Sequence, residues 1–542
     1  MSESDSLSEE DSSDNVRQTV NESLNRLVRH FASRAENMPE GVAQDTFVSV
    51  SDVTDGLIRR DHQVLFGRRG SGKTHAFRYL EAAIEDRGDL AIFVDLRTVG
   101  SSGGMYADDA ISRASRGTQL LIDVLEAVHS SLLAAAIGND GFEGLLPHLD
   151  QLAEALTEVR VDGSLSLTSE SAGSVDSSKG GSVELAADFS SKAGLKGKRE
   201  RSSKKSSSTK TTLQRSGVEV PRVLFGRLTR ALGALGGSIS PRRVWLLLDE
   251  WSSLPKDLQP ILADMFRRAM FPVASFSIKI AAIERRSNFL ERTHDSANYI
   301  GFEMGSDTAA SISLDERIAD EVERRTFFAE LLYKHLAVTM RTEFDRVLSI
   351  GSAAELANTM FGEGALEEFV RAAEGVPRDA LQIVGHAAKM ANTKAISRSN
   401  VHSGAHRFYL QDKELGIAGN DAAEATWRKL IRDIVDARRS RAFLVRRDRL
   451  NTSPGLLDLH DARLIHLVQS GLYTKRDPGT MYDGYYLDFG SYITMLNEIE
   501  LAQQWSSNGN PWRVESGEAV LPDSFEPGLI FNPPTARKGR SR

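Results

Sequence analysis

The chain has 542 residues, 40% hydrophobic and 26% charged, with a formal net charge of −8 and no cysteine. Its length predicts several soluble domains, its acidic balance argues against a globally basic nucleic-acid binder, and the lack of cysteine excludes disulfides, thiolate metal sites and cysteine nucleophiles. Because we find no run of about 18 uninterrupted apolar residues and no signal-peptide pattern at the start, we expect a cytoplasmic protein with no membrane partner.

The first fifty residues are predicted to form a tail followed by a helical segment. Residues 1–14 are mostly Ser, Asp and Glu and predict a disordered acidic tail. Apolar residues at helical spacing then predict a helical segment within residues 15–50.

The segment 67–74, GRRGSGKT, fits the pattern G-x-x-x-x-G-K-[ST] of a phosphate-binding loop. Gln63–Phe66 before it reads as a buried strand, and His75–Ile84 after it reads as a helix, which is the context that the pattern requires. Glycines let the backbone N–H groups face a phosphate, Lys73 would reach the β- and γ-phosphates, and the Thr74 hydroxyl would hold Mg²⁺. We therefore predict that ATP and Mg²⁺ are bound by Gly67, Gly70, Ser71, Gly72, Lys73 and Thr74.

The chain continues with a second buried strand at Leu90–Leu96 and a long helix at 107–133. Residues 163–216 are rich in Ser, Gly, Lys and Thr and predict a mobile insertion, with a β-hairpin compatible with the residues around 183–185. Its basic run is typical of a solvated linker, or of a contact with nucleic acid or an acidic partner.

A second chemical motif follows the apolar strand Val244–Leu248, which ends in Asp249 and Glu250. The carboxyl edge of a parallel sheet is where ligands bind in open α/β folds. Asp249 is expected to hold the Mg²⁺ shell, and Glu250 to orient and deprotonate the attacking water.

Two arginines are candidates to contact the triphosphate, the first of them beside the γ-phosphate. The strand Ser277–Ile283 ends in Glu284, Arg285 and Arg286, and Arg285 at its tip is the preferred candidate; the alternative is a charged surface loop. Pro377 suits the first turn of a helix, so Arg378 would lie in that turn and reach back from a helical lid.

The order of these parts resembles the AAA+ ATPases, in the branch that contains origin-recognition-complex-like initiators. In that family GRRGSGKT would be Walker A, LLLDE Walker B, the strand ending at Ile283 would carry sensor 1, and GVPR would be sensor 2. The resemblance covers residues 50–395 and implies an α/β P-loop core with a parallel sheet, followed by a helical lid. It departs at sensor 1, where an arginine in place of the usual Asn resembles the STAND signalling ATPases. Candidates for the family's trans-acting arginine finger are Arg267, Arg268 and Arg292.

Residues 396–510 look like the winged-helix α+β domain that often follows such a lid. We predict a helix at Asp458–Val468 and paired strands at 471–476 and 482–487, with 477–480 as the turn. An upstream arginine cluster would contact double-stranded DNA phosphates or dock onto protein. Its members are Arg438, Arg439, Arg441, Arg446, Arg447 and Arg449.

The sequence thus predicts an ATP-hydrolysing switch with six parts. Their boundaries are 1–14 for the acidic tail, 15–50 for the N-terminal helical segment, 51–310 for the ATPase core with its insertion at 163–216, 311–395 for the lid, 396–510 for the winged-helix-like domain and 511–542 for the C-terminal tail. The first hypothesis is a DNA-associated protein of replication, transposition or defence. The alternative is a STAND-like switch that oligomerises with ATP and recruits a protein partner without nucleic acid. A P-loop kinase is a third reading, disfavoured because kinases usually lack the water-activating glutamate.

Overall fold

The structure is a computed structural model that describes most of the chain in two compact units. The first unit is Met1–Leu156 with Leu224–Arg542, and the second is Thr157–Val223. The described residues are 17–31, 38, 41–49, 51–99, 106, 108, 110–138, 141–156, 159–162, 165–170, 210–215, 218–221, 223–292, 299–315, 321–344, 349–450, 452–474, 477–496 and 529–534. The predicted acidic tail, the hairpin around 183–185 and most of the C-terminal tail lie outside these residues.

A five-stranded parallel sheet forms the centre of the first unit, in the order β11-β1-β8-β7-β2. Its strands are β1 (Gln63–Phe66), β2 (Leu90–Asp95), β7 (Val244–Asp249), β8 (Phe276–Ala282) and β11 (Ile312–Ser313). Strands β1, β7 and β8 are buried along their whole length, as the apolar runs in the sequence predict for a parallel sheet covered on both faces. The α/β fold with its parallel sheet is therefore confirmed.

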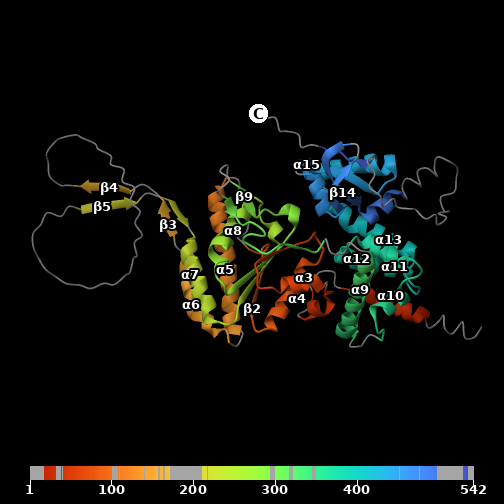
Figure 1. The fold of residues 1–542 in the computed structure, drawn as a ribbon, viewed down its shortest axis with the longest axis horizontal. Coiled ribbons are helices and arrows are strands. Elements are labelled where there is room, and N and C mark those ends of the chain that lie inside the picture. The colour runs from red at the N-terminus through yellow and green to blue at the C-terminus, as the bar shows by residue number, and fades with distance from the viewer. Residues whose placement is uncertain are drawn as a thin grey trace, which may run out of the picture. The chain divides into compact units, whose positions relative to one another are not determined.

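Helices alternate with these strands along the chain (Figure 1). They are α2 (Val42–Thr46), α3 (Ser51–Leu57), α4 (Lys73–Glu85), α5 (Arg113–Gly138), α6 (Leu146–Leu156), α7 (Phe225–Ser238) and α8 (Gln259–Met265). Short helical segments are η3 (Glu143–Leu145), η4 (Trp251–Ser253), η5 (Phe266–Met270) and η6 (Glu284–Arg286), and β9 (Leu290–Arg292) pairs with β10 (Tyr299–Gly301). Residues 17–28 are helical as well.

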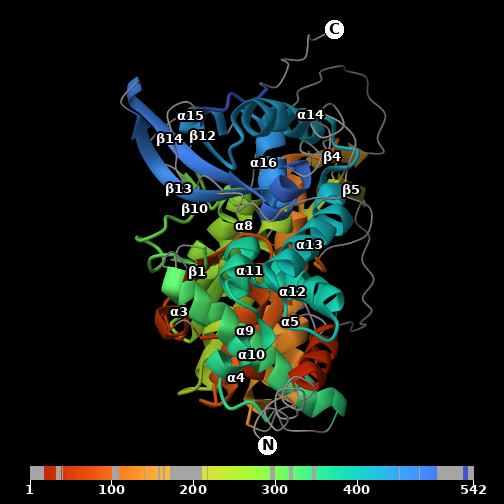
Figure 2. The same ribbon diagram turned by 90° about the vertical axis from the view of Figure 1, so that its right-hand side faces the viewer.

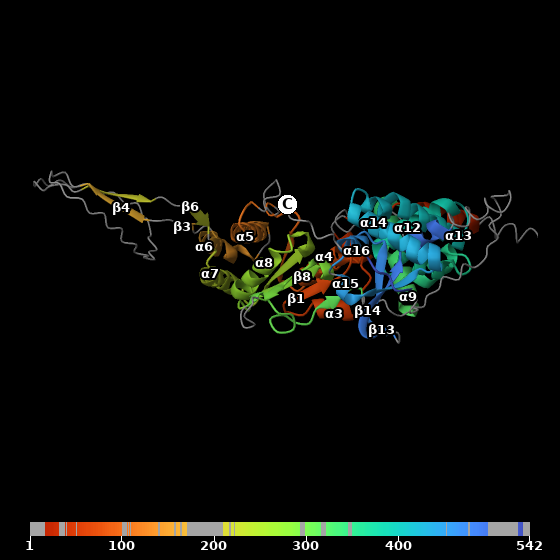
Figure 3. The same ribbon diagram turned by 90° about the horizontal axis from the view of Figure 1, so that it is seen from above.

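Helix α4 covers one face of the sheet, and the sheet and helix are seen together in Figure 3. Phe77 and Leu80 of α4 pack with Trp245 and Leu247 of β7 in one apolar cluster. Alternate residues of a strand point to the same face, so this packing fixes which face of β7 meets α4 and anchors the helix that follows the P-loop.

Helix α5 is unusually long and apolar. By length and composition alone it could cross a membrane, and it is the one such helix among the described residues. Its side chains Leu120, Val124 and Leu132 are fully buried, and the helix packs against β2, α6 and α8. Core helices of soluble proteins pass the same test of composition.

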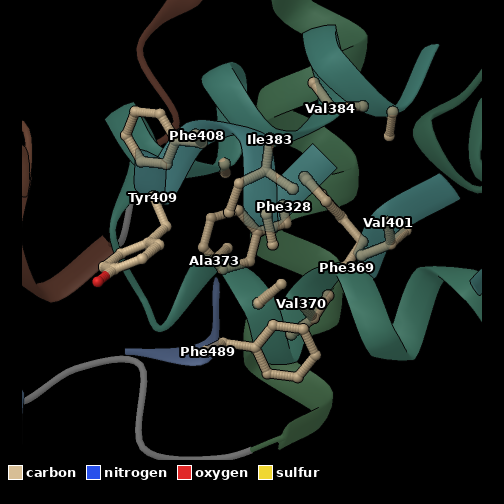
Figure 4. Packing of buried hydrophobic residues seen from close by; sticks show 14 of the residues in the cluster. Phe328, Phe369, Val370, Ala373, Ile383, Val384, Val401, Phe408, Tyr409 and Phe489 are labelled. Carbon is tan, nitrogen blue, oxygen red and sulfur yellow. The ribbon is translucent and has the colours of Figure 1, made fainter. Parts of the chain in front are cut away.

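Four helices follow the sheet and lie within the predicted lid, residues 311–395 (Figure 2). They are α9 (Glu321–Phe344), α10 (Ala353–Met360), α11 (Ala365–Ala373) and α12 (Pro377–Ala391), and α13 (Arg398–Phe408) comes next. Figure 4 shows Phe328, Phe369, Ile383 and Val401 from four of these helices gathered in one apolar core. The lid therefore shares its core with the segment that follows it.

The C-terminal domain, here α13 to β14, contains a three-stranded antiparallel sheet in the order β12-β14-β13. The elements after α13 are η7 (Tyr409–Lys413), η8 (Glu414–Ile417), α14 (Asp421–Leu430), η9 (Ile431–Asp436), β12 (Ala442–Arg446), α15 (Arg447–Leu450), α16 (Pro454–Asp461), β13 (Ile465–Thr474) and β14 (Asp477–Leu487). From α14 onward, apart from η9, the connectivity is helix, strand, helix, helix, strand, strand.

Two local predictions in this domain are wrong. The helix predicted for Asp458–Val468 ends at Asp461, because Arg463 adopts φ 61 and Ile465 begins a strand paired with Leu487. A short apolar run fits a helix or a strand equally well, and here strand pairing decides. The predicted turn at 477–480 lies inside β14, since Thr474 already pairs with Asp477.

The second unit contains two antiparallel strand pairs. Strand β3 (Val159–Asp162) pairs with β6 (Val218–Pro221), and β4 (Leu165–Glu170) pairs with β5 (Lys210–Arg215). Both ends of the segment predicted from composition as a mobile insertion are therefore paired strands. Its basic run up to Lys205 lies outside the described residues.

Candidate functional site

The P-loop, Gly67–Thr74, joins β1 to α4 at the carboxyl edge of the sheet. Gly72 is the residue before α4 and adopts φ 96, a left-handed conformation that other residues rarely take. Gly70 adopts φ 85, and a Cβ there would lie 3.0 Å from Val376 and 3.2 Å from the Cβ of Arg378. The positive φ thus requires glycine at both Gly70 and Gly72. At Gly70 the close approach of the lid requires it too.

Lys73 is buried at the start of α4, where its Nζ donates to the carbonyl oxygens of Gly67 at 2.8 Å and Arg68 at 3.1 Å. Burial lowers the pKa of Lys73, and neighbouring carboxylates oppose this shift. The Ser71 Oγ is also buried and has no hydrogen-bond partner within the described residues. A buried ammonium and an unpaired hydroxyl at a helix N-terminus suit the binding of phosphate oxygens.

Thr74 and Asp249 provide hard oxygen atoms side by side. The Thr74 Oγ1 donates to Asp249 Oδ2 at 2.6 Å, and Asp95 lies opposite Asp249 in the paired strands β2 and β7. Burial raises the pKa of Asp249, whereas the Thr74 hydroxyl lowers it. Hydroxyl and carboxylate oxygens are the ligands that Mg²⁺ prefers, so these residues fit the predicted ion.

Glu250 follows directly and adopts φ 57, an uncommon backbone conformation for a non-glycine residue. Its backbone N–H donates to Asp249 Oδ1 at 2.8 Å, and its carboxylate Oε1 lies 4.0 Å from Nη1 of Arg97. Arg97 in turn pairs with Asp95 at 2.6 Å. Backbone strain of this kind occurs at functional sites, and it supports the role predicted for Glu250.

Sensor candidate Arg378 lies beside the P-loop although more than 300 residues separate them. Pro377 is the first residue of α12, and the Arg378 N–H donates to the carbonyl oxygen of Gly70 at 3.4 Å. The positive charge of Arg378 also contributes to the lowered pKa of Lys73. The start of α12 therefore contacts the P-loop through its backbone, and the reach of the Arg378 guanidinium to a triphosphate stays a prediction.

Arg285 lies at the tip of β8 as expected, but its guanidinium contacts the C-terminal domain. Its Nη2 is 3.2 Å from Oδ2 of the buried Asp483 on β14. The neighbouring Arg286 pairs with Asp461 and lies 3.9 Å from Asp458, both on α16. A contact of Arg285 with the γ-phosphate would require this ion pair to open.

The three arginine-finger candidates are all paired within the chain. Arg267 and Arg268 contact Asp264 at 2.7 and 2.8 Å, and Arg292 contacts Glu303 at 3.0 Å. Nothing in these contacts favours one of them as a trans-acting residue.

A small apolar cavity of about 50 Å³ adjoins the P-loop between the N-terminal segment and the lid. A nucleotide base would have to displace side chains to enter it. Its lining residues are Phe47, Val48, Val53, Ser71, Gly72, His75, Leu314, Phe327, Leu331 and Pro377.

Sequence reasoning missed a network of buried charges, here called the buried junction, between the lid and the C-terminal domain. Lys413 pairs with Asp379 of α12 at 2.7 Å and with Asp488, while Arg463 pairs with Asp379 and Arg441 pairs with Glu374. The junction consists of Glu374, Asp379, Lys413, Arg441, Arg463, His466 and Asp488. The sequence signals neither these pairs nor their burial, because the partners are far apart in the chain.

Within the junction, Glu374, His466 and Asp488 offer ligand atoms within 4.8 Å of one another, as a metal site would. The Arg68 Nη1, however, lies 2.8 Å from His466 Nδ1. A guanidinium only donates, so Nδ1 must accept and Nε2 must carry the proton, which leaves no lone pair for a metal. We therefore assign no cation to this cluster.

The predicted DNA-contacting arginine cluster needs correction. Arg441 is 2% exposed, pairs with Glu374 and donates from Nε to the carbonyl oxygen of Leu487 at 2.9 Å. Arg446 pairs with Asp448 at 2.9 Å. Arg441, just before β12, is thus excluded from any phosphate contact, because it is buried and paired with Glu374. Arg438, Arg447 and Arg449 are exposed and Arg439 is partly exposed.

Comparison with known families and structures adds to this geometry. The model of the ORC-CDC6-like family matches residues 31–86, the segment that contains the P-loop. The predicted resemblance to ORC/Cdc6-like AAA+ ATPases is confirmed. Among solved structures, the chain matches the ORC1 protein of Aeropyrum pernix in complex with DNA, at 12% identity, over 88% of this chain and 97% of that one, with a TM-score of 0.31. No curated protein matches the chain.

Proposed function

We propose that this protein binds and hydrolyses ATP with Mg²⁺ and that the nucleotide state alters the contacts among the core, the lid and the C-terminal domain. The observation that carries the proposal is the convergence of a P-loop lysine, a Thr74–Asp249 oxygen pair and the strained Glu250 at one sheet edge. These residues come from the start of α4 and the end of β7, as nucleotide hydrolysis in this fold requires.

The chain's own residues divide the chemistry as follows. Lys73 and the P-loop N–H groups hold the β- and γ-phosphates, and Thr74 and Asp249 hold Mg²⁺, which neutralises charge on the phosphate oxygens. Glu250 accepts a proton from the water that attacks the γ-phosphate, and Arg378 reaches the triphosphate from the lid. Burial of Lys73 and Asp249 strengthens these charge contacts relative to water.

The first hypothesis for the biological role is an association with double-stranded DNA. The helix, strand, helix, helix, hairpin order of the C-terminal domain supports a winged-helix interpretation, and its exposed Arg438, Arg447 and Arg449 would contact phosphates. Counted from α14, the third helix of this domain is α16. It carries Asp458 and Asp461, which both lie against Arg286, and these carboxylates argue against a direct reading of DNA bases by α16.

The alternative is a STAND-like switch that assembles with ATP and recruits a protein. It is favoured by the same contacts, because acidic residues of the C-terminal domain already bind the arginines at the tip of β8. In this reading the domain acts within the molecule and duplex DNA is irrelevant.

ATP turnover by the purified full chain, with and without duplex DNA at 50 and 200 mM salt, tests these readings. DNA association predicts a stimulation that falls steeply with salt, by about tenfold or more, and that weakens in Arg447→Gln. The switch predicts turnover indifferent to DNA and an increase in light scattering with a non-hydrolysable ATP analogue. Absence of turnover under every condition would contradict the proposed hydrolysis.

A further inference from the structure

Arg68, the second residue of the P-loop, contacts three separate parts of the fold. Its backbone N–H and its Nε donate to the carboxylate of Asp315, at 2.8 and 3.2 Å, just after β11. Its Nη1 contacts His466 Nδ1 at 2.8 Å on β13, and its Nη2 donates to the carbonyl oxygen of Glu374 at 2.8 Å in the lid. The side chain is only 13% exposed.

The planar guanidinium makes these contacts interdependent. Nη1 and Nη2 lie in one plane at a fixed separation, so His466 and Glu374 are held in register by a single side chain. A lysine at this position would offer one point charge and could not bridge both acceptors while also binding Asp315. The arrangement is therefore specific to arginine.

The far end of this link is anchored in the buried junction. The Glu374 carboxylate pairs with buried Arg441 and accepts from the Phe489 N–H at 3.0 Å. The His466 Nε2 lies 3.5 Å from Glu374 Oε2 and 3.7 Å from Asp488 Oδ1. Because these groups are buried close to one another, we expect a displacement of Arg68 to be felt by protein groups and not by solvent.

At its other end, the link from Arg68 begins at Lys73, the lysine predicted to bind the phosphates. The Nζ of Lys73 donates to the carbonyl oxygen of Arg68 at 3.1 Å. A bound triphosphate would draw this ammonium to its own oxygens and take a hydrogen bond from the backbone of Arg68. The backbone that carries the guanidinium would then lose one of its restraints.

We propose that Arg68 is a positioning residue that couples phosphate binding at Lys73 to the C-terminal domain, through neutral His466 and the backbone of Glu374. The inference rests on the proposed nucleotide binding and adds the route by which occupancy reaches β13. ATP loosens the contact between the P-loop and the β13–β14 hairpin, and removal of the Arg68 guanidinium uncouples the two.

Hydrogen–deuterium exchange of the full chain, followed in segment 465–487, tests this coupling. The probe is a non-hydrolysable ATP analogue with Mg²⁺, and its affinity is measured on the same samples by calorimetry. In the parent protein the analogue should accelerate exchange in this segment by about fivefold or more, the lower end of typical coupling between sites. In Arg68→Gln and Arg68→Lys the analogue should still bind, but exchange should no longer respond.

Arg87→Gln serves as the matched control, because Arg87 is an exposed arginine that lies just after α4 and outside the P-loop. It should respond like the parent protein. His466→Leu removes the acceptor of the Arg68 guanidinium without changing any P-loop residue. It therefore tests the coupling if Arg68→Gln does not fold. A merely structural role would raise exchange equally with and without the analogue.

A response of parent size in Arg68→Gln, or in His466→Leu, would overturn the coupling role. So would analogue binding to the parent protein with no change in exchange. A parent protein that binds no analogue would instead contradict the proposed function, and calorimetry distinguishes that outcome.

Discussion

At the scale of single residues, Glu250 is the group whose role is most sharply testable. Its left-handed backbone and its position after Asp249 favour a carboxylate turned toward the phosphate site. Glu250→Gln keeps the shape and removes the proton acceptor. ATP hydrolysis should fall by about 100-fold or more while ATP affinity changes little, because general-base catalysis contributes on this order. Single-turnover kinetics and calorimetry measure the two quantities, and parent-rate turnover would retire Glu250 as the base.

Residue types and their order predicted much of this site. Lys73, Thr74, Asp249 and Glu250 were identified because each follows a recognisable strand or starts a helix. Asp315 was missed because β11 is only two residues long and leaves no periodic signal. The Asp483 partner of Arg285 depends on a tertiary contact across nearly 200 residues, and local sequence carries no information about it.

At the scale of elements, α12 lies so close to the P-loop that we expect substitutions of the loop glycines to lower the free energy of unfolding by different amounts. Gly70→Ala and Gly72→Ala both impose a side chain at positive φ, which costs about 1–2 kcal/mol. Only the Cβ at Gly70 meets the lid, whereas a Cβ at Gly72 meets nothing within 4 Å. Gly70→Ala should therefore be the more destabilising by about 1 kcal/mol in urea titrations. Equal losses would show that the lid does not press on the loop.

The buried junction joins α12 to the C-terminal domain and predicts a larger effect. Asp379 is fully buried and pairs with both Lys413 and Arg463. Asp379→Asn leaves two buried cations undercompensated, so unfolding free energy should drop by about 3 kcal/mol or more. The helical surface pair Glu424–Arg428 is the control, since Glu424→Gln should change stability by about 0.5 kcal/mol or less. Similar losses in the two variants would contradict a structural role for the junction.

At the scale of elements the sequence also shows its limit. The apolar run of β7 identifies its strand, because such runs are typical of a buried parallel sheet, and β8 is recognisable although Ser277 and Lys279 interrupt its apolar residues. The apolar face of Asp458–Val468 predicts a helix, and only the pairing with β14 makes Ile465 onward a strand. Local pattern therefore predicts the P-loop core better than it predicts the C-terminal domain.

At the scale of the whole molecule, buried neutral histidines should make the fold acid-sensitive. Burial lowers the pKa of His335 on α9 from an ordinary 6.5 to about 4. Between these values the unfolded chain binds a proton that the folded chain does not, so this contribution to stability is full above pH 6.5 and is lost as pH falls toward 4. In His335→Leu the loss of unfolding free energy from pH 7 to pH 5 should be smaller than in the parent protein, by about 2 kcal/mol. Urea titrations at the two pH values measure it, and an unchanged pH dependence would contradict the assignment.

The central claim is that the P-loop of this molecule is a nucleotide site, and calorimetric titration of the full chain with ATP and Mg²⁺ tests it most directly. The parent protein should bind one ATP per chain. Lys73→Ala should weaken binding by at least about 30-fold, because it leaves phosphate charge without its main buried partner. Equal affinity in parent and variant, or no binding by the parent protein, would contradict the account.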